Sequence, residues 1–189
     1  MRNSRFLALV LLCGSALGCG QDAITTGPVQ EPSIAAVGNL GSLAAYAFGD
    51  VTETQFDIVN EYSFVATRGR DGDVAGTFRW TASWNGETFH GTGRVTCLTV
   101  IDNVALMTGV FEETDATWIP ADRQHVVWAV EDNGNKKKSS PDRASLLHPS
   151  ISEAQADFYC STLGLLMTPV EEGEVVVWSR PGNAGNAGT

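Results

Sequence analysis

The chain has 189 residues and carries 22 acidic against 12 basic side chains, so its formal net charge is −10. This excess of negative charge argues against binding nucleic acid and against an electrostatic clamp on a membrane surface. Hydrophobic residues make up 43% of the sequence, which is ordinary for a globular protein. The length suits one domain and is short for two.

The first 18 residues have the order of a secretory signal peptide. A positive start at Arg2 and Arg5 precedes an unbroken apolar run, Phe6–Leu12, which is too short to span a membrane. The junction Gly18-Cys19 that follows resembles the lipobox of bacterial lipoproteins. The resemblance implies cleavage after Gly18 and acylation of Cys19, with several acyl chains forming a stable membrane anchor. The alternative is an ordinary signal peptide and a freely secreted protein.

Removal of residues 1–18 leaves 171 residues with 10 basic and 22 acidic side chains, a net charge of −12. We divide this mature chain into a flexible lipid-anchored tether, 19–33, a single β-barrel-like domain, 34–179, and a disordered tail, 180–189. Gly20, rather than an aspartate, follows the acylated cysteine. This favours an outer-membrane or cell-surface address over retention at the inner membrane.

Two cysteines, Cys97 and Cys160, remain in the predicted domain. Two cysteines in an exported domain most simply pair, so we predict a disulfide that closes a loop of 63 residues. The chain-entropy model gives about 4 kcal/mol of stabilisation for such a loop, less any strain. Free thiols or a metal pair are the alternatives, and no partner ligands lie nearby in the sequence.

The first half of the domain contains two alternating segments. Residues 34–47 are small, apolar and interrupted by glycine, which leaves helix and strand both open. Alternation predicts strands over 62–67 and 77–84. Their apolar faces are Tyr62, Phe64 and Ala66 on the first, and Phe78, Trp80, Ala82 and Trp84 on the second.

Asn85-Gly86 after the second strand is the strongest short hairpin signal, because both turn positions need a positive φ. A two-residue turn sets the register: Trp84 opposite Glu87, Ala82 opposite Phe89, Trp80 opposite Gly91, and Phe78 opposite Gly93. Large rings then face small residues across the pair. Rings can lie over strand glycines, and the glycines permit the coiling that closes a sheet.

Further strands are predicted over 95–101, 104–111, 125–131 and 174–179, with Gly109 breaking the second of them. Ser152 with Gln155 forms a capping-box pattern and predicts a short helix through about Leu163. The disulfide would hold this helix against the Cys97 strand, and the last strand could pair with the Tyr62 strand. The predicted fold is all-β: a small antiparallel β-barrel or closed sandwich, built as a meander with one short helix.

The segment from about Tyr62 to Trp178 resembles a group of uncharacterised exported bacterial all-β proteins. The shared features are a glycine-rich hairpin, a Val-x-Cys-Leu-x-Val strand, an Asn-x-Ala element with a following glycine, an Asp-Asn-Gly loop and a late cysteine. In this chain they are Gly86–Gly91, Val95–Val100, Asn103–Gly109, Val130–Gly134 with Asp142 and Ser145, and Cys160. The resemblance implies an all-β domain and no established activity.

The aromatic side chains admit two interpretations. The first places them in a filled core, and the second places some of them around a cavity for an apolar ligand. The candidate ligand-lining residues are Phe78, Trp80, Trp84, Phe89 and Trp128.

We predict no catalytic residue, metal site or cofactor. The three histidines, His90, His125 and His148, have no close spacing of the kind that zinc sites use, and the register above turns His90 toward solvent.

The first functional hypothesis is an exported, lipid-anchored β-domain with a binding or structural role at the cell envelope, its partner an envelope protein. The alternative is a lipocalin-like carrier of a small apolar ligand, and the third is a barrel-type cyclase or isomerase.

Overall fold

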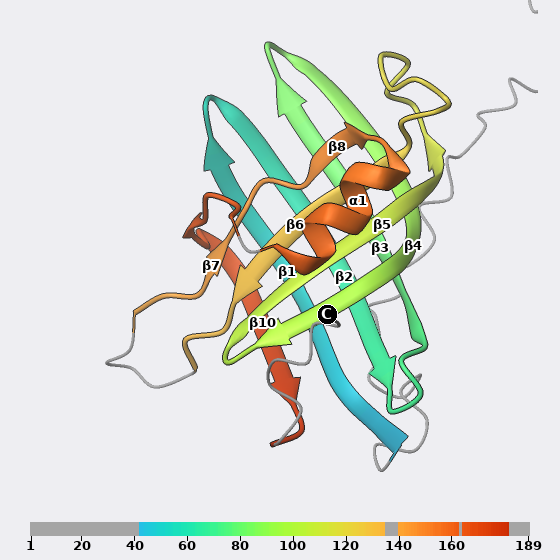
Figure 1. Ribbon diagram of the computed structural model, residues 1–189. Helices are drawn as coiled ribbons and strands as arrows, with labels where there is room; N and C mark the ends of the chain where they lie inside the picture. Colours follow the sequence, from blue (N-terminus) through green and yellow to red (C-terminus); the bar gives the residue numbers. More distant parts are fainter. Residues whose placement is uncertain (1–41, 135–139, 163, 182–189) are drawn as a thin grey trace, which may run out of the picture. The chain divides into compact units, whose positions relative to one another are not determined.

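The computed structural model describes residues 42–134, 140–162 and 164–181 (Figure 1). The predicted signal peptide, the acylated Cys19, the tether and the tail from residue 182 onward lie outside the described residues. Contacts divide the chain into two units, Met1–Glu31 and Pro32–Thr189. The second unit contains every described element and both hydrophobic cores, so we expect it to fold on its own.

The described residues form ten strands and one helix. In chain order they are β1 (Leu43–Gln55), β2 (Ile58–Gly69), β3 (Val74–Trp84), β4 (Glu87–Ile101), β5 (Val104–Thr114), β6 (His125–Glu131), β7 (Arg143–Ala144), β8 (His148–Ile151), α1 (Glu153–Ser161), β9 (Thr168–Pro169) and β10 (Glu172–Ser179). One antiparallel sheet runs in the order β10-β1-β2-β3-β4-β5-β6-β7-β9, with β8 also paired to β6. It curls into a half-barrel, which confirms the all-β meander (Figure 1).

The hairpin between β3 and β4 has the predicted register: Trp84 faces Glu87, Ala82 faces Phe89, Trp80 faces Gly91 and Phe78 faces Gly93. Asn85 and Gly86 have φ values of 53° and 81°, as a tight hairpin turn requires. The Phe78 ring occupies the space that side chains at two glycines would need. A Cβ atom at Gly93 would lie 2.6 Å from this ring, and one at Gly109 would lie 2.7 Å from it.

Two segments that were predicted separately form one strand, and the predicted break at Gly109 is absent. The structure joins the hairpin arm and the predicted strand 95–101 into one 15-residue strand, β4, with register shifts at Thr92/Gly93 and Val95/Cys97. Such irregularities bend a long strand without ending it. Gly109 does not break β5, because it pairs with Val126 in the sheet. The Phe78 ring fills the space that a side chain at Gly109 would take.

The last strand has a different neighbour from the one predicted. β10 pairs with β1, not with the Tyr62 strand β2, because β1 lies between them. The segment left open over 34–47 is therefore extended from Leu43 onward. The turn joining β1 to β2 is Phe56-Asp57, with φ values of 53° and 64°. Phe56 is an unusual residue at positive φ, so the sequence gives little sign of this hairpin.

The exposed side of β10 is held by two aspartate side chains that follow β6 and precede β7. Asp132 Oδ2 accepts the Val177 N–H at 3.0 Å, and Asp142 Oδ2 accepts the Val175 N–H at 3.2 Å. The other oxygens accept backbone N–H groups of Gly134 and Asn133, both at 2.8 Å. This aspartate clasp, Asp132 and Asp142, satisfies edge groups that would otherwise be open to another strand.

Helix α1 begins with the predicted capping box, in which the Ser152 and Gln155 side chains each bond the other's backbone N–H. The helix lies across the outer face of the sheet in front of β5 and β6 (Figure 1). A small second core forms beneath it from Leu106, Val127, Ala129, Ile151 and Ala156. The alternate side chains of β5 and β6 face the larger inner core, so these two strands are covered on both faces.

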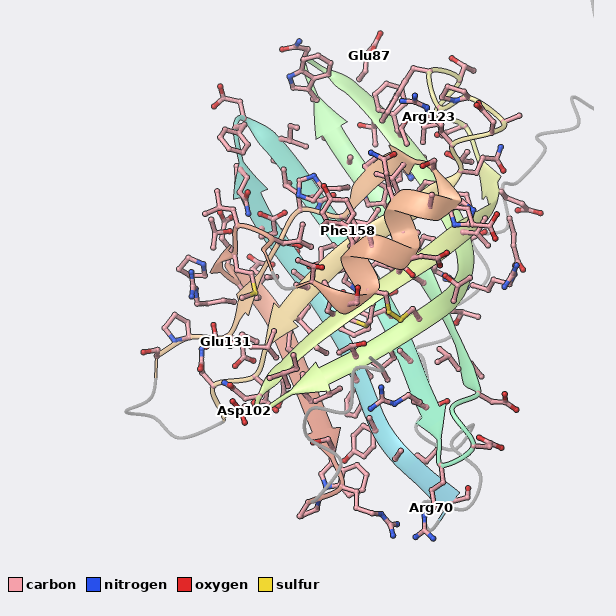
Figure 2. The ribbon with its side chains drawn as sticks, viewed as in Figure 1. Arg70, Glu87, Asp102, Arg123, Glu131 and Phe158 are labelled. Carbon is pink, nitrogen blue, oxygen red and sulfur yellow. A yellow bond between two sulfur atoms is a disulfide. The ribbon has the colours of Figure 1, made fainter. Side chains whose placement is uncertain are left out.

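Cys97 on β4 and Cys160 on α1 form the predicted disulfide, with their Cα atoms 6.2 Å apart. The yellow bond beneath the helix in Figure 2 marks it. The bridge holds the helix on the sheet beside the outer core, and Thr99 Oγ1 lies 3.6 Å from Cys160 Sγ.

Replacing both cysteines with serine should lower the free energy of unfolding by about 2–4 kcal/mol, because the unfolded chain regains the freedom of the closed loop. Urea denaturation followed by circular dichroism measures the loss, and reduction of the parent protein should reproduce it. Labelling of both thiols in unreduced, unfolded parent protein would contradict the pairing.

Candidate ligand-binding site

A pocket of about 460 Å³ lies between β2, β3 and β4 on one side and the segment before β8 on the other. Its lining is mainly apolar: Ile58, Trp80, Ala82, Trp84, Phe89, Trp118, Leu146, Leu147 and Pro149. The polar contributions come from Asn60, Glu87 and His148. Figure 2 labels Glu87 at the tip of the β3–β4 hairpin, and this marks the end of the sheet where the pocket lies.

The candidate aromatic residues separate into two groups. Trp80, Trp84 and Phe89 line the pocket. Phe78 and Trp128 do not line it: they are 2% and 0% exposed in the inner core, with ring centroids 5.3 Å apart. The physical reason is that Phe78 fills the space above the strand glycines and Trp128 packs against it. Side chains therefore fill the middle of the inner face of the sheet.

The mouth of the pocket has aromatic walls on two sides. Trp118, in the loop between β5 and β6, meets Phe89 edge to face, with ring centroids 6.1 Å apart and planes at 85°. Trp84 and Trp118 remain 51% and 50% exposed, although both are large apolar side chains. Exposed aromatic rings beside a pocket are typical of sites that bind apolar molecules.

A buried polar chain runs inward from the pocket wall. Trp80 Nε1 donates to Asn60 Oδ1 at 2.7 Å, and Asn60 Nδ2 donates to Glu53 Oε1 at 3.0 Å. The other Glu53 oxygen accepts from Thr168 Oγ1 at 3.3 Å. Glu53 has no exposed surface, and this burial raises the pKa of its carboxyl above the usual value despite the hydrogen bonds.

Sequence reasoning missed Asn60 in the pocket lining and Glu53 behind it, and it left Trp118 out of the five candidate lining residues. A signal for Glu53 was present: it alternates with Val51 and Gln55, and all three are buried on the inner face of β1. The alternation would have found it had the segment been read as a strand.

Tyr62 and Ser145 position the wall opposite the sheet. Tyr62 Oη donates to the Ser145 carbonyl at 2.9 Å, and Ser145 Oγ accepts the Ala129 N–H at 2.9 Å. Burial, with the nearby Glu53 carboxyl adding to it, raises the pKa of Tyr62 well above 10, so the hydroxyl remains a donor. These bonds hold Leu146 and Leu147, the next residues along the chain, against the pocket.

The three histidines are dispersed. His148 lines the pocket, and burial lowers the pKa of its ring. His90 faces solvent as predicted, with Nδ1 3.2 Å from Thr81 Oγ1, and it borders a shallow second hollow of about 430 Å³ with Arg79 and Asp115. Within the described ranges, no three His, Cys, Asp or Glu side chains are grouped to hold a metal ion.

Comparisons with known proteins assign neither a family nor a function to this chain. No protein-family model matches the sequence, and no curated protein or solved structure matches it either. No helix among the described residues has the length and apolar character needed to cross a membrane.

The Glu53→Gln variant should gain stability over the parent at pH 7, and the gain should shrink as the pH falls. The folded-state pKa of Glu53 is raised, so the ionised carboxyl costs stability at neutral pH. As the pH falls through the pKa of Glu53 in the folded protein, the carboxyl takes up a proton and this cost decreases. The cost is gone once the pH is below the pKa of the same carboxyl in the unfolded chain. Urea denaturation between pH 7 and pH 4 measures the difference, with exposed Glu61→Gln as the control. A gain in the free energy of unfolding that does not change with pH would contradict the raised pKa of Glu53.

Proposed function

We propose that the mature protein is an exported, lipid-anchored β-domain that binds a small, largely apolar ligand in the pocket between β2, β3, β4 and the segment before β8. The observation that carries the proposal is a pocket of about 460 Å³ that persists although the neighbouring core is filled. Its size and its mainly apolar lining with a few polar groups are typical of small-molecule sites.

The pocket favours a carrier over a purely structural module. A structural module needs a filled interior and an apolar patch for its partner, whereas here the exposed Trp84 and Trp118 form the walls of a cavity. An enzymatic role has weaker support, because the buried carboxyl of Glu53 does not line the pocket and reaches it through the Asn60 amide. We therefore assign no catalytic residue.

Export and anchoring are supported by the N-terminal sequence and by the disulfide. Residues 1–18 have the order of a signal peptide, and Gly18-Cys19 resembles a lipobox. Disulfides persist in oxidising compartments, which agrees with a domain outside the cytoplasm. We propose an outer-membrane or cell-surface location, with the lipid on Cys19 as the contact with the membrane.

Native mass spectrometry of residues 20–189, exported into an oxidising compartment and purified without detergent, should show a reproducible bound mass that is lost on unfolding. Trp118→Ala should weaken retention of that mass about tenfold by removing an aromatic wall. Phe158→Ala is the matched control, because Phe158 is 60% exposed on α1 and does not line the pocket. A spectrum of ligand-free protein, or equal losses in both variants, would count against the proposal.

Cys19→Ala should abolish incorporation of labelled palmitate and release the protein from the membrane fraction, because the variant lacks the thiol that is acylated. Fractionation of a bacterial host that processes lipoproteins measures both effects, and the parent chain is the control. Unchanged membrane association of the variant would show that the anchor lies elsewhere.

A further inference from the structure

Asn60 is the buried polar side chain of the pocket wall, and two hydrogen bonds fix its orientation. Its Oδ1 accepts from Trp80 Nε1, and its Nδ2 donates to Glu53 Oε1. An amide nitrogen carries two hydrogens, and in the described part of the chain only one of them has an acceptor. Asn60 is 1% exposed and lines the pocket, so an N–H without an acceptor lies at the pocket wall.

The charges around the pocket disfavour anions. The carboxyl of Glu53 bonds the Asn60 amide directly. Glu87, at the tip of the β3–β4 hairpin (Figure 2), adds a second carboxyl to the pocket lining. Among the described residues, the lining includes neither lysine nor arginine. Its one histidine, His148, is neutral at pH 7 because burial lowers its pKa. An anionic group placed on Asn60 would meet a carboxylate, with no counter-charge among the described lining residues, and burial makes such a contact costly.

The walls of the pocket favour a flat or compact apolar body. Trp80, Phe89 and Trp118 supply ring surfaces, and the Phe89–Trp118 pair meets nearly at a right angle. Leu146 and Leu147 close the opposite side. Apolar contact supplies the attraction, and a single polar contact at Asn60 fixes the orientation.

We infer, resting on the proposed function, that the ligand is a neutral, compact apolar molecule with one hydrogen-bond acceptor, such as a ketone, ester or ether oxygen. That oxygen receives the second N–H of Asn60. Glu53 is a positioning residue: it orients the amide and excludes carboxylates such as fatty acids. A buried donor that needs an acceptor discriminates strongly between ligands of similar shape.

Two probes of nearly identical shape test the inference: 2-acetylnaphthalene, a neutral ketone, and 2-naphthoate, an anion. Ligand-observed NMR titration of residues 20–189 at pH 7.5 should show the ketone binding about tenfold tighter or more. The carbonyl carbon of ¹³C-labelled 2-acetylnaphthalene should move downfield on binding, relative to its position in cyclohexane, because the oxygen accepts a hydrogen bond. Trp118→Ala should weaken both probes, which places them in this pocket.

Glu53→Gln separates the role of charge from that of shape. Glutamine keeps an acceptor for Asn60 and removes the negative charge, so the affinity for naphthoate should rise about tenfold relative to the affinity for the ketone. Glu87→Gln is the matched control at the rim and should change naphthoate binding less. The carbonyl shift in the parent protein is independent of this variant and reports whether the bound oxygen accepts a hydrogen bond.

The outcomes distinguish the inference from the proposed function. Two results would overturn the inference and leave a binding pocket in place. One is equal affinity for the two probes, and the other is a carbonyl chemical shift in the bound ketone that equals its value in cyclohexane. Failure of both probes to bind, or binding that Trp118→Ala does not weaken, counts against the proposed function at this pocket.

Discussion

The contact between the Phe78 ring and two strand glycines is the constraint on which the rest of the molecule depends. Gly93 on β4 and Gly109 on β5 have no side chains where the ring lies, so the sheet can curl tightly around it. A side chain at either position would push the strands away from the ring. The curl fills the middle of the inner face with Phe78, Phe111 and Trp128. The space left over is at the hairpin end, where the pocket is found.

Burial of a carboxyl next to this aromatic core carries a cost that the structure offsets with hydrogen bonds. Glu53 accepts hydrogen bonds from Asn60 on β2 and from Thr168 on β9, two strands that are far apart in the sheet order. Breaking a network of this kind leaves an uncompensated buried group, so its members act as a unit. The same network fixes the Asn60 amide at the pocket wall. The polar centre therefore stabilises one arrangement of the strands and presents one defined donor to the pocket.

The elements that sequence reasoning predicted are those whose local pattern agrees with their environment. The β3–β4 register follows from Asn85-Gly86 and from rings opposite glycines, and the helix start follows from Ser152 and Gln155. The parts that were missed depend on contacts between distant segments. β1 ends in a turn that begins with Phe56, an unusual residue at positive φ. Without β1, neither the partner of β10 nor the burial of Glu53 can be inferred. Whether an aromatic ring lines a cavity or fills a core also depends on the strand curvature, which periodicity does not encode.

The aspartate clasp has a consequence for how the chain can be altered. Asn133 donates its backbone N–H to Asp142 and its side-chain amide to the Pro141 carbonyl, so the two ends of the connection between β6 and β7 are tied together directly. These hydrogen bonds join the two ends of the connection without involving the residues between them. Lengthening the connection therefore costs only about 0.6 kcal/mol for each doubling of its length. The connection is therefore a natural place to insert a reporter peptide or a whole domain, far along the chain from the pocket-lining hairpin.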